Sequence, residues 1–515
     1  MTLYPNEGAK GPTKAIVVGA GLGGLATGMR LGAKGYRVTV LDRLDRVGGR
    51  GSSITQDGHR FDLGPTIITV PQVYEKLWAA CGRDFYTDVT LKPLDPYYEI
   101  RWPDGSNFFA TGDTKIMETE VARLNPSDVQ GYRKFLEDSY RRYVVGFEGM
   151  VAEPMHKAWD TVKVLPTFAL LRADQSILKL AKKRVRDERL RMALSFHPLF
   201  IGGDPMNVTS MYALVSHLEK EYGVHYAMGG VQAIADAMAG VIEDQGGQVV
   251  LGAEVDEIVT QGGKARGVRM ADGETLDASV VVSNADAGHT YKHLLRQQPK
   301  PTWTRASVTR RWSMSLFVWY FGTKGTRDMW KDVGHHTILS GPRYEGLLKD
   351  IFIKGKLADD MSLYLHRPAL TDPTVAPEGD DTFYALSPVP HLGHDNGVEW
   401  SEEEAIYKRK VARVLNETIP GFQERLSTEV VFTPETFCDR YLSPFGAGFS
   451  LEPRILQSAW FRPHNVTPIS GLYLTGAGTH PGAGVPGVVS SAEVLGKMIP
   501  DAPDPMVQDI KMAAE

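Results

Sequence analysis

Hydrophobic residues in the first 42 positions form two short continuous runs separated by a segment with helical spacing. The first run, AIVV, covers 15–18 and leads directly into the glycine pattern GxGxxG, formed by Gly19, Gly21 and Gly24. GLATGMRLGAKG then has the spacing of a helix, and YRVTVLD is a second apolar run that ends at Asp42. This order predicts a βαβ unit of about 30 residues, with an acidic residue about 20 positions beyond the loop.

Each residue of this unit has a physical role in binding a dinucleotide. Gly19 permits a tight turn, Gly21 lets the backbone approach a pyrophosphate, and Gly24 lets the helix pack closely on the strand. The helix N-terminus presents free N–H groups and a partial positive charge to the phosphates. Asp42 can accept hydrogen bonds from both ribose hydroxyls. The loop alone does not separate NAD from FAD.

The residues that follow Asp42 favour FAD. RLDRVGGRGSS adds Gly49 and Arg50 where a nicotinamide enzyme would normally continue into another crossover helix, and an extended FAD needs contacts beyond its ribose. Arg50 has two interpretations. It contacts the cofactor, at a phosphate or at the flavin edge, or it is a surface arginine. Gly64 and Pro65, in HRFDLGPTIIT, predict a bend between two apolar strands that either packs against a flat ring or is a plain turn.

The hydrophobic pattern changes twice further along the chain. Residues 95–220 are rich in helix formers, with a break predicted near Asn125–Pro126. An α/β pattern returns at 223–290, where Val255 would lie near the adenine end of a dinucleotide if this segment joins the front sheet, and is otherwise a core valine. SLFVWYFG, at 315–322, is apolar on both faces and predicts a strand that is buried or lines an apolar site.

Dinucleotide-type segments therefore occur at the front, in the middle and at the end of the chain. We predict an α/β fold with a Rossmann-type FAD-binding domain of discontinuous segments, an inserted mixed α+β substrate domain and a helical region. The predicted boundaries are 14–94, 223–300 and 455–500 for the FAD-binding domain, 95–222 for a helical membrane or substrate region, 301–454 for the substrate-binding domain, 1–13 for a flexible N-terminus and 501–515 for a tail.

Charge and composition exclude several classes of function. A net charge of −5 and a pI near 6.3 argue against a nucleic-acid partner. No metal site is expected, because Cys81 and Cys438 form no cluster and His335 and His336 have no further ligand at metal spacing. No apolar run reaches the length of about 20 residues that spans a bilayer, so the chain is soluble or lies on a membrane surface. The basic segment 179–191 is either a solvated helix face or a membrane contact.

Several segments together carry a family resemblance, which extends from Ala15 to about Lys497. The sequence resembles the bacterial phytoene desaturases of the carotenoid desaturase/isomerase flavoproteins, closest to those of purple phototrophic bacteria. The segments that carry it are AIVVGAGLGGLATGMRLGAKGYRVTVLDRLDRVGGRGSS, RFDLGPTIIT, ALSFHPLFIGGDP, SNADAGHTY, GHHTILSGPRY, SLYLHRPALTDPTVAPEGDDTFYALSPVPHLG, ILQSAWFRPHN and YLTGAGTHPGAGVPGV. The resemblance implies an amine-oxidase-like architecture, FAD, a C40 polyene substrate such as phytoene, and a peripheral position at the cytoplasmic side of a membrane.

Such chemistry needs a hydride acceptor held against an allylic C–H and an apolar tunnel for a substrate without polar groups. We expect the conversion of phytoene to neurosporene or lycopene, with oxygen or a quinone reoxidising the cofactor. No catalytic acid or base can be identified from the sequence. The alternatives are a later-step desaturase for a hydroxylated or methoxylated carotenoid, an amine or porphyrinogen oxidase, and a flavin-free prenyl or lipid carrier. Ala477 stands where amine-oxidase relatives have an acid, which weakens the oxidase alternative.

A second glycine-rich loop, TGAGTHPGAGVPG, covers 475–487. The strand before it is predicted to lie beside the front sheet, and Pro486 suits the first turn of the helix that follows. That helix would point its N-terminus at the flavin and stabilise the negative charge of the reduced ring. We therefore predict that this loop binds the flavin half of the same FAD, through Gly476, Gly484, Gly487 and Val488.

Overall fold

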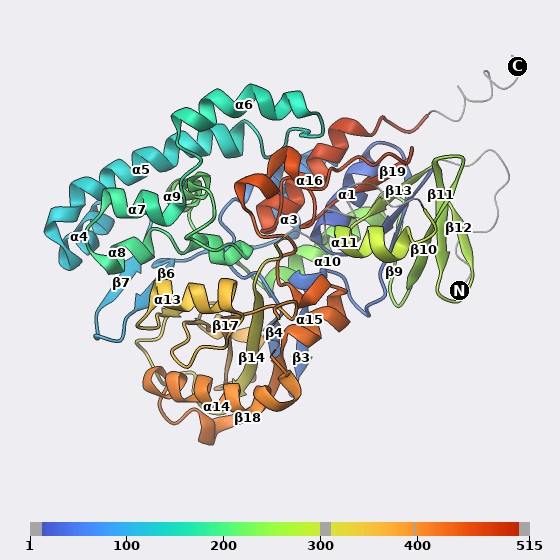
Figure 1. Cartoon of the computed structure of the whole chain (residues 1–515). Helices are drawn as coiled ribbons and strands as arrows, with labels where there is room; N and C mark the ends of the chain where they lie inside the picture. The colour runs from blue at the N-terminus through green and yellow to red at the C-terminus, as the bar shows by residue number, and fades with distance from the viewer. Residues whose placement is uncertain (1–12, 299–310, 396–397, 504–515) are drawn as a thin grey trace, which may run out of the picture.

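The computed structural model describes residues 13–298, 311–395 and 398–503 (Figure 1). A five-stranded parallel sheet, in the order β19-β13-β1-β2-β9, forms the base of one domain. Its strands are β1 (Lys14–Val18), β2 (Arg37–Leu41), β9 (Gln248–Val250), β13 (Val280–Ser283) and β19 (Leu472–Leu474). The prediction that this domain combines front, middle and C-terminal segments is confirmed.

Both faces of the parallel sheet are covered, as its continuous apolar strands require. Helices α1 (Leu22–Ala33), α10 (Gly230–Asp244) and α16 (Val485–Met498) share one hydrophobic core with it. On the other face, a small antiparallel sheet, made of β10 (Val255–Gln261), β11 (Lys264–Met270) and β12 (Thr275–Asp277), encloses a second core. Val255 therefore belongs to this antiparallel sheet, and the prediction that its segment joins the front sheet is correct only for β9.

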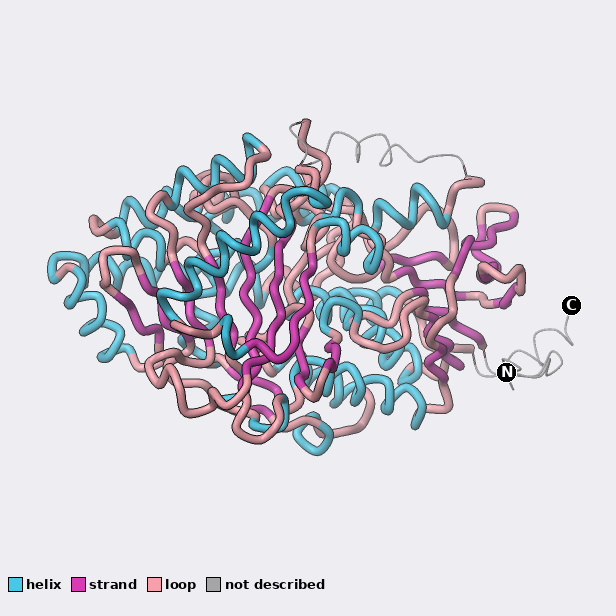
Figure 2. Tube along the Cα trace, turned by 90° about the horizontal axis from the view of Figure 1, so that it is seen from below, coloured by secondary structure: helices cyan, strands magenta, loops and turns pink. Residues whose placement is uncertain are grey.

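A seven-stranded mixed sheet forms the second domain, in the order β18-β14-β17-β16-β15-β6-β7. Its strands are β6 (Tyr98–Arg101), β7 (Asn107–Ala110), β14 (Ser315–Thr323), β15 (His336–Leu339), β16 (Leu363–His366), β17 (Asp381–Val389) and β18 (Leu426–Phe432). Alternate side chains of β14 and β17 point to opposite faces, and one face packs on α14 (Trp400–Thr418) in a third core. Seen from below, α14 lies over these strands (Figure 2).

Residues 95–222 are not purely helical, because β6 and β7 pair with the sheet of the substrate domain. The helices of this region are α4 (Thr114–Leu124), α5 (Val129–Tyr143), α6 (Ala158–Leu170), α7 (Ile177–Arg184), α8 (Glu188–Ala193) and α9 (Leu214–Tyr222). The predicted break near Asn125–Pro126 is confirmed between α4 and α5. The basic segment 179–191 is divided between α7 and α8, and none of the helices in the described residues is long and apolar enough to cross a membrane.

Shorter elements connect the two domains. A hairpin of β3 (Ser53–Gln56) and β4 (His59–Asp62) leads to Gly64–Pro65. In the described residues after this bend, Ile68 forms only an isolated bridge with His225 before α2, so the first of the two predicted flanking strands is confirmed. The remaining elements are α2 (Gln72–Ala80), α3 (Phe85–Asp88), β5 (Leu91–Pro93), β8 (His225–Ala227), α11 (Ala287–His289), α13 (Tyr344–Lys349) and α15 (Pro434–Tyr441).

Candidate active site

A cavity of about 1120 Å³ is lined by residues from both domains and from the helical region. The carboxyl ends of β1, β2, β13 and β19 open into it, which is where open α/β sheets bind ligands. Twelve of the thirteen cofactor candidates named from the sequence line this cavity, and Gly24 is the exception. The fold brings these residues together from distant segments of the chain. That they bind FAD stays a prediction.

The front loop makes the turn that its glycines predict. Gly19 has a φ of +101°, and its N–H donates to the carbonyl of Leu41 at 2.7 Å. Gly21 is the N-cap residue of α1 and has no side chain to cap the helix, so the first N–H groups of α1 face the cavity. A Cβ on Gly24 would lie 2.0 Å from the carbonyl oxygen of Gly19, which explains why this glycine packs behind the loop instead of lining the cavity.

Asn284 packs against this loop and was not identified from the sequence as part of the site. It follows β13, and its backbone N–H donates to Val18 while its amide nitrogen donates to the carbonyl of Gly19 at 3.3 Å. A Cβ on Gly21 would lie 2.8 Å from this amide, and one on Gly476 would lie 2.6 Å from the amide oxygen. Asn284 therefore joins the front and back glycine loops. Its position directly after the apolar run VVVS, at the end of a strand, is the sequence feature that could have indicated this role.

Asp42 ends β2 and lines the cavity. Its carboxylate accepts hydrogen bonds from the N–H groups of Ala20 and Leu44, at 2.7 and 2.9 Å. Burial raises the pKa of this carboxyl, and the two N–H donors oppose that shift. The carbonyl of Asp42 also accepts from the N–H of Ala253, which brings Val255 to the same end of the cavity although it lies in another sheet.

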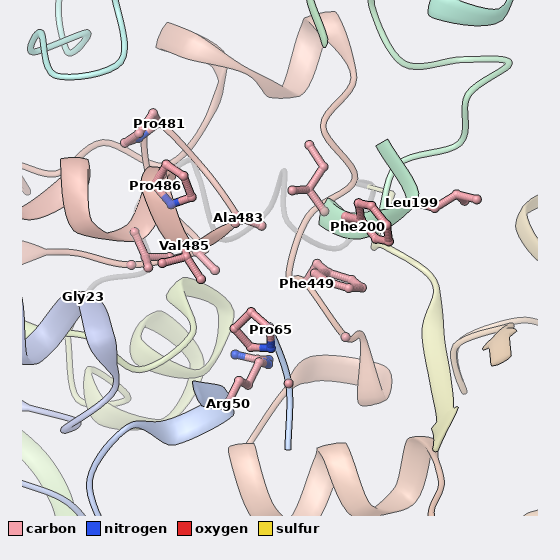
Figure 3. Close-up of a pocket in the computed structure, with 18 of the residues that line it drawn as sticks. Gly23, Arg50, Pro65, Leu199, Phe200, Phe449, Pro481, Ala483, Val485 and Pro486 are labelled. Atoms are coloured by element: carbon pink, nitrogen blue, oxygen red, sulfur yellow. The ribbon is translucent and has the colours of Figure 1, made fainter. Parts of the chain in front are cut away.

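Arg50 and the bend at Gly64–Pro65 form the next part of the wall. The guanidinium of Arg50 donates to Ser443 Oγ at 3.0 Å and stacks over the ring of Tyr441, but its Nε has no partner among the described residues. Burial lowers the pKa of Arg50. A Cβ on Gly64 would lie 2.1 Å from the carbonyl oxygen of Arg50, so the bend requires glycine. Figure 3 shows Arg50 beside Pro65.

The back loop ends at the first turn of α16. Gly476 and Gly484 have φ angles of +93° and +95°, and Gly484 is the uncapped N-cap residue. A Cβ on Gly487 would lie 2.7 Å from the carbonyl oxygen of Gly482. Pro486 lies in the first turn as predicted, and Val488 lines the cavity from the same turn. The N-terminus of α16 thus faces the cavity, like that of α1.

These features fit an extended dinucleotide. Two helices of 12 and 14 residues present uncapped N-termini to one cavity, and each end offers N–H groups and positive potential to an anion or an electron-rich ring edge. Nε of Arg50 adds a donor to the same cavity that has no partner among the described residues. Glycines allow the backbone to approach the ligand at both loops. FAD, which has a pyrophosphate at one part and a redox ring at the other, matches this order of groups.

The remaining wall of the cavity is mostly apolar and aromatic. Inward-facing residues alternate along β14 and β17, and further aromatic residues come from the segment after α8 and from the loop before β19. These residues are Leu316, Val318, Tyr320, Tyr384, Leu386, Pro388, Phe196, Phe200 and Phe449. Figure 3 shows Phe200 and Phe449 on the side of the hollow opposite Val485. A long hydrocarbon can contact such a wall without leaving polar groups unpaired.

Comparisons with known proteins agree with this geometry. The family model for flavin containing amine oxidoreductase matches residues 22–493. The chain belongs to the flavin-containing amine oxidoreductase family. It is an FAD-dependent oxidoreductase of amine-oxidase-like fold.

Individual relatives are also similar over nearly the whole chain. A phytoene desaturase (neurosporene-forming) of Cereibacter sphaeroides is 67% identical over 95% of both chains. A phytoene desaturase (lycopene-forming) of a Paracoccus species is 42% identical over 94% of this chain and 97% of its own. A putrescine oxidase mutant structure superposes with a TM-score of 0.62 at 16% identity, covering 94% of this chain and 97% of the other, which supports the fold alone.

Proposed function

We propose that this enzyme desaturates 15-cis-phytoene, with neurosporene as the main product and lycopene as the product of a further round. The observation that carries the proposal is the continuity between the FAD-type cradle and the apolar wall within one cavity. The substrates named for the similar relatives are hydrocarbons that such a wall accepts. A hydroxylated or methoxylated carotenoid remains the second candidate, since its polyene portion would contact the same wall.

When bound, FAD would supply a hydride acceptor. The residues that would hold it come from both loops: Asn284 joins the two glycine loops, and the first turn of α16 would offer N–H donors to an electron-rich ring edge. The aromatic wall excludes water and holds the polyene by shape, because a hydrocarbon offers no group for hydrogen bonding. Oxygen or a quinone would reoxidise the cofactor.

Ala477 separates this site from an amine oxidase. It lines the cavity, has no ionisable side chain, and its carbonyl accepts from Arg462 at 2.7 Å. An amine oxidase of this fold has an acid at this position, and Ala477 supplies no polar side chain there. A flavin-free carrier would not need two helix N-termini and the Nε donor of Arg50 facing one cavity, because it binds no anionic cofactor.

The substrate dissolves in membranes, and α6 provides a surface that would reach it. This helix lines the cavity with Leu165 and Phe168 and exposes four large apolar side chains, Trp159, Val162, Leu165 and Leu170. Ile455 and Leu456 also line the cavity and are exposed. An exposed apolar rim at a cavity is typical of a membrane-interaction site.

Exposed cations adjoin this rim. Lys157 and Lys163 lie at or beside α6 and are exposed, and Arg172, just beyond it, pairs with Asp174. In the basic segment 179–191, Lys182 pairs with Glu345 and Arg189 with Asp187. Its exposed apolar side chains make the α6 rim the better membrane contact. We propose a peripheral location at the cytoplasmic side of the membrane, with α6 lying in the lipid headgroup region.

Expression in cells that accumulate phytoene tests the function directly. The pigments extracted should contain neurosporene, and purified protein supplied with FAD should be yellow and lose its flavin absorbance when phytoene in vesicles is added without oxygen. Unchanged phytoene and unchanged absorbance would contradict the proposal. Colourless protein after the addition of FAD would favour a carrier, and conversion of only hydroxylated carotenoids would favour a later-step desaturase.

A further inference from the structure

A buried chain of hydroxyl and imidazole groups begins at the cavity wall and leads behind it. Thr66 directly follows the Gly64–Pro65 bend and lies 2.9 Å from the hydroxyl of Tyr364 and 3.1 Å from that of Tyr384. Thr66 and both tyrosines line the cavity. Tyr384 donates to the carbonyl of Gly64 at 3.4 Å. The phenols therefore touch the same short segment that is predicted to lie against FAD.

Tyr364 leads away from the cavity. Its hydroxyl lies 2.6 Å from Nδ1 of His336, on the neighbouring strand β15. His336 is directly opposite His366 in the β15–β16 register, and their rings stack at 5.2 Å. The Nε2 atoms of His366 and His335 lie 3.1 Å apart, and Nδ1 of His335 lies 2.6 Å from the hydroxyl of Thr371, which is partly exposed.

The three histidines lie close enough to exchange protons. One ring nitrogen from each lies within 4.8 Å of the others. Nε2 of His336 and Nδ1 of His366 have no hydrogen-bond partner among the described residues, so one bridging water would complete the chain between them. Burial lowers the pKa of His335 to about 3 and the pKa values of His336 and His366 well below their usual value, so all three imidazoles are neutral at pH 7. A neutral imidazole holds one proton and one free lone pair, which allows it to pass protons along a chain.

We propose that Tyr364 and His336 receive the proton that phytoene loses, and that His366, His335 and Thr371 carry it to the surface. This inference rests on the proposed function, because desaturation removes a proton as well as a hydride. Next to the carbon that loses the hydride, a C–H bond of the neighbouring carbon breaks, and its electron pair becomes the new C=C bond. The proton bonds to the oxygen of Tyr364 as the Tyr364 O–H proton passes to Nδ1 of His336. His336 returns to neutral by releasing its Nε2 proton into the chain.

The chemistry does not require a strong base. The proton leaves a carbon next to a developing cation, so a phenol backed by an imidazole is sufficient, and a low-pKa imidazole releases the proton again. Because the wall around the polyene is mostly apolar, a path through the wall carries the proton away without its crossing the hydrocarbon. Tyr364 is the group that contacts the substrate space, and His336 acts through it as a positioning and relay residue.

Tyr364→Phe, His336→Gln and His336→Ala test the relay, with Tyr407→Phe as the matched control. Tyr407 is also fully buried and bonds Ser387 of the same sheet at 2.7 Å, but on the face away from the cavity. With phytoene in vesicles, Tyr364→Phe and His336→Gln should lower kcat at least ten-fold, with KM and FAD content unchanged. Added imidazole should restore part of the kcat of His336→Ala. The control should keep its kcat.

Three results would overturn the relay. The first is a kcat for Tyr364→Phe within two-fold of the unaltered enzyme at full FAD content. The second is an equal loss in Tyr407→Phe together with no imidazole rescue of His336→Ala. The third is one equivalent of zinc or another metal in the purified protein that His336→Ala lacks, since the three imidazoles would then be ligands. If the unaltered enzyme does not convert phytoene, the proposed function fails instead.

Discussion

The apolar rim of α6 gives a quantitative prediction for membrane binding. Trp159 and Leu170 are 63% and 83% exposed, so together they offer about one and a half large side chains to a membrane. Complete burial of such a side chain contributes about 2 kcal/mol, so replacing both by serine should weaken vesicle binding by about 3 kcal/mol. This corresponds to a roughly 100-fold lower partition coefficient. Flotation with vesicles of zwitterionic and anionic phospholipid measures it.

The control pair is Tyr86→Ser with Ile353→Ser, which are 52% and 57% exposed and lie outside α6. This pair should leave vesicle binding within two-fold of the unaltered protein, and FAD content should be unchanged in both pairs. The α6 pair should raise the KM for phytoene in vesicles. Equal effects of the two pairs, or no loss of binding by the α6 pair, would refute the argument that this face meets the membrane.

Three further predictions concern the cofactor site and stability. Gly487→Leu should abolish FAD binding, measured by flavin absorbance, while circular dichroism stays unchanged, because a side chain there meets the Gly482 carbonyl. Arg50→Ala should raise the FAD dissociation constant at least ten-fold in a fluorescence titration, since charge-assisted hydrogen bonds are worth about 1.5–3 kcal/mol; an unchanged constant would remove Arg50 from the site. Burial raises the pKa of Asp62 to about 7, above its unfolded value, so its ionisation costs stability as pH rises from about 4 to 7. Asp62→Asn should therefore raise the melting temperature, relative to the unaltered protein, more at pH 8 than at pH 5. An equal change in melting temperature at both pH values would contradict this.

The FAD-binding domain could be predicted largely from sequence because its signals are local. The GxGxxG loop, its flanking strands and Asp42 occur within one short segment, and β13 and β19 each precede a polar or glycine-rich turn. Parallel strands of this type are continuously apolar, so each could be recognised separately and assigned to one sheet. The uncapped N-terminus of α16 followed from Gly484 and Pro486.

Features that depend on non-local pairing could not be predicted. β6 and β7 lie in a region dominated by helix formers, and only their pairing with β15 places them in the substrate domain. His366 was not connected with His336 because 30 positions separate them, and the antiparallel register alone makes them neighbours. Asn284 likewise contacts Gly19 through the order of strands in the sheet.

The division of the cavity explains why the sequence contains no recognisable catalytic motif. The glycine loops need defined backbone conformations, and these leave a strong local pattern. The polyene wall needs only apolar volume, which many combinations of residues provide, so its positions are dispersed over β14, β17, α13 and the segment after α8. A substrate held by shape can move along such a wall between rounds of desaturation. The number of rounds should therefore depend on wall residues such as Phe196 and Tyr344, whereas substitutions in the glycine loops should change the rate of every round alike.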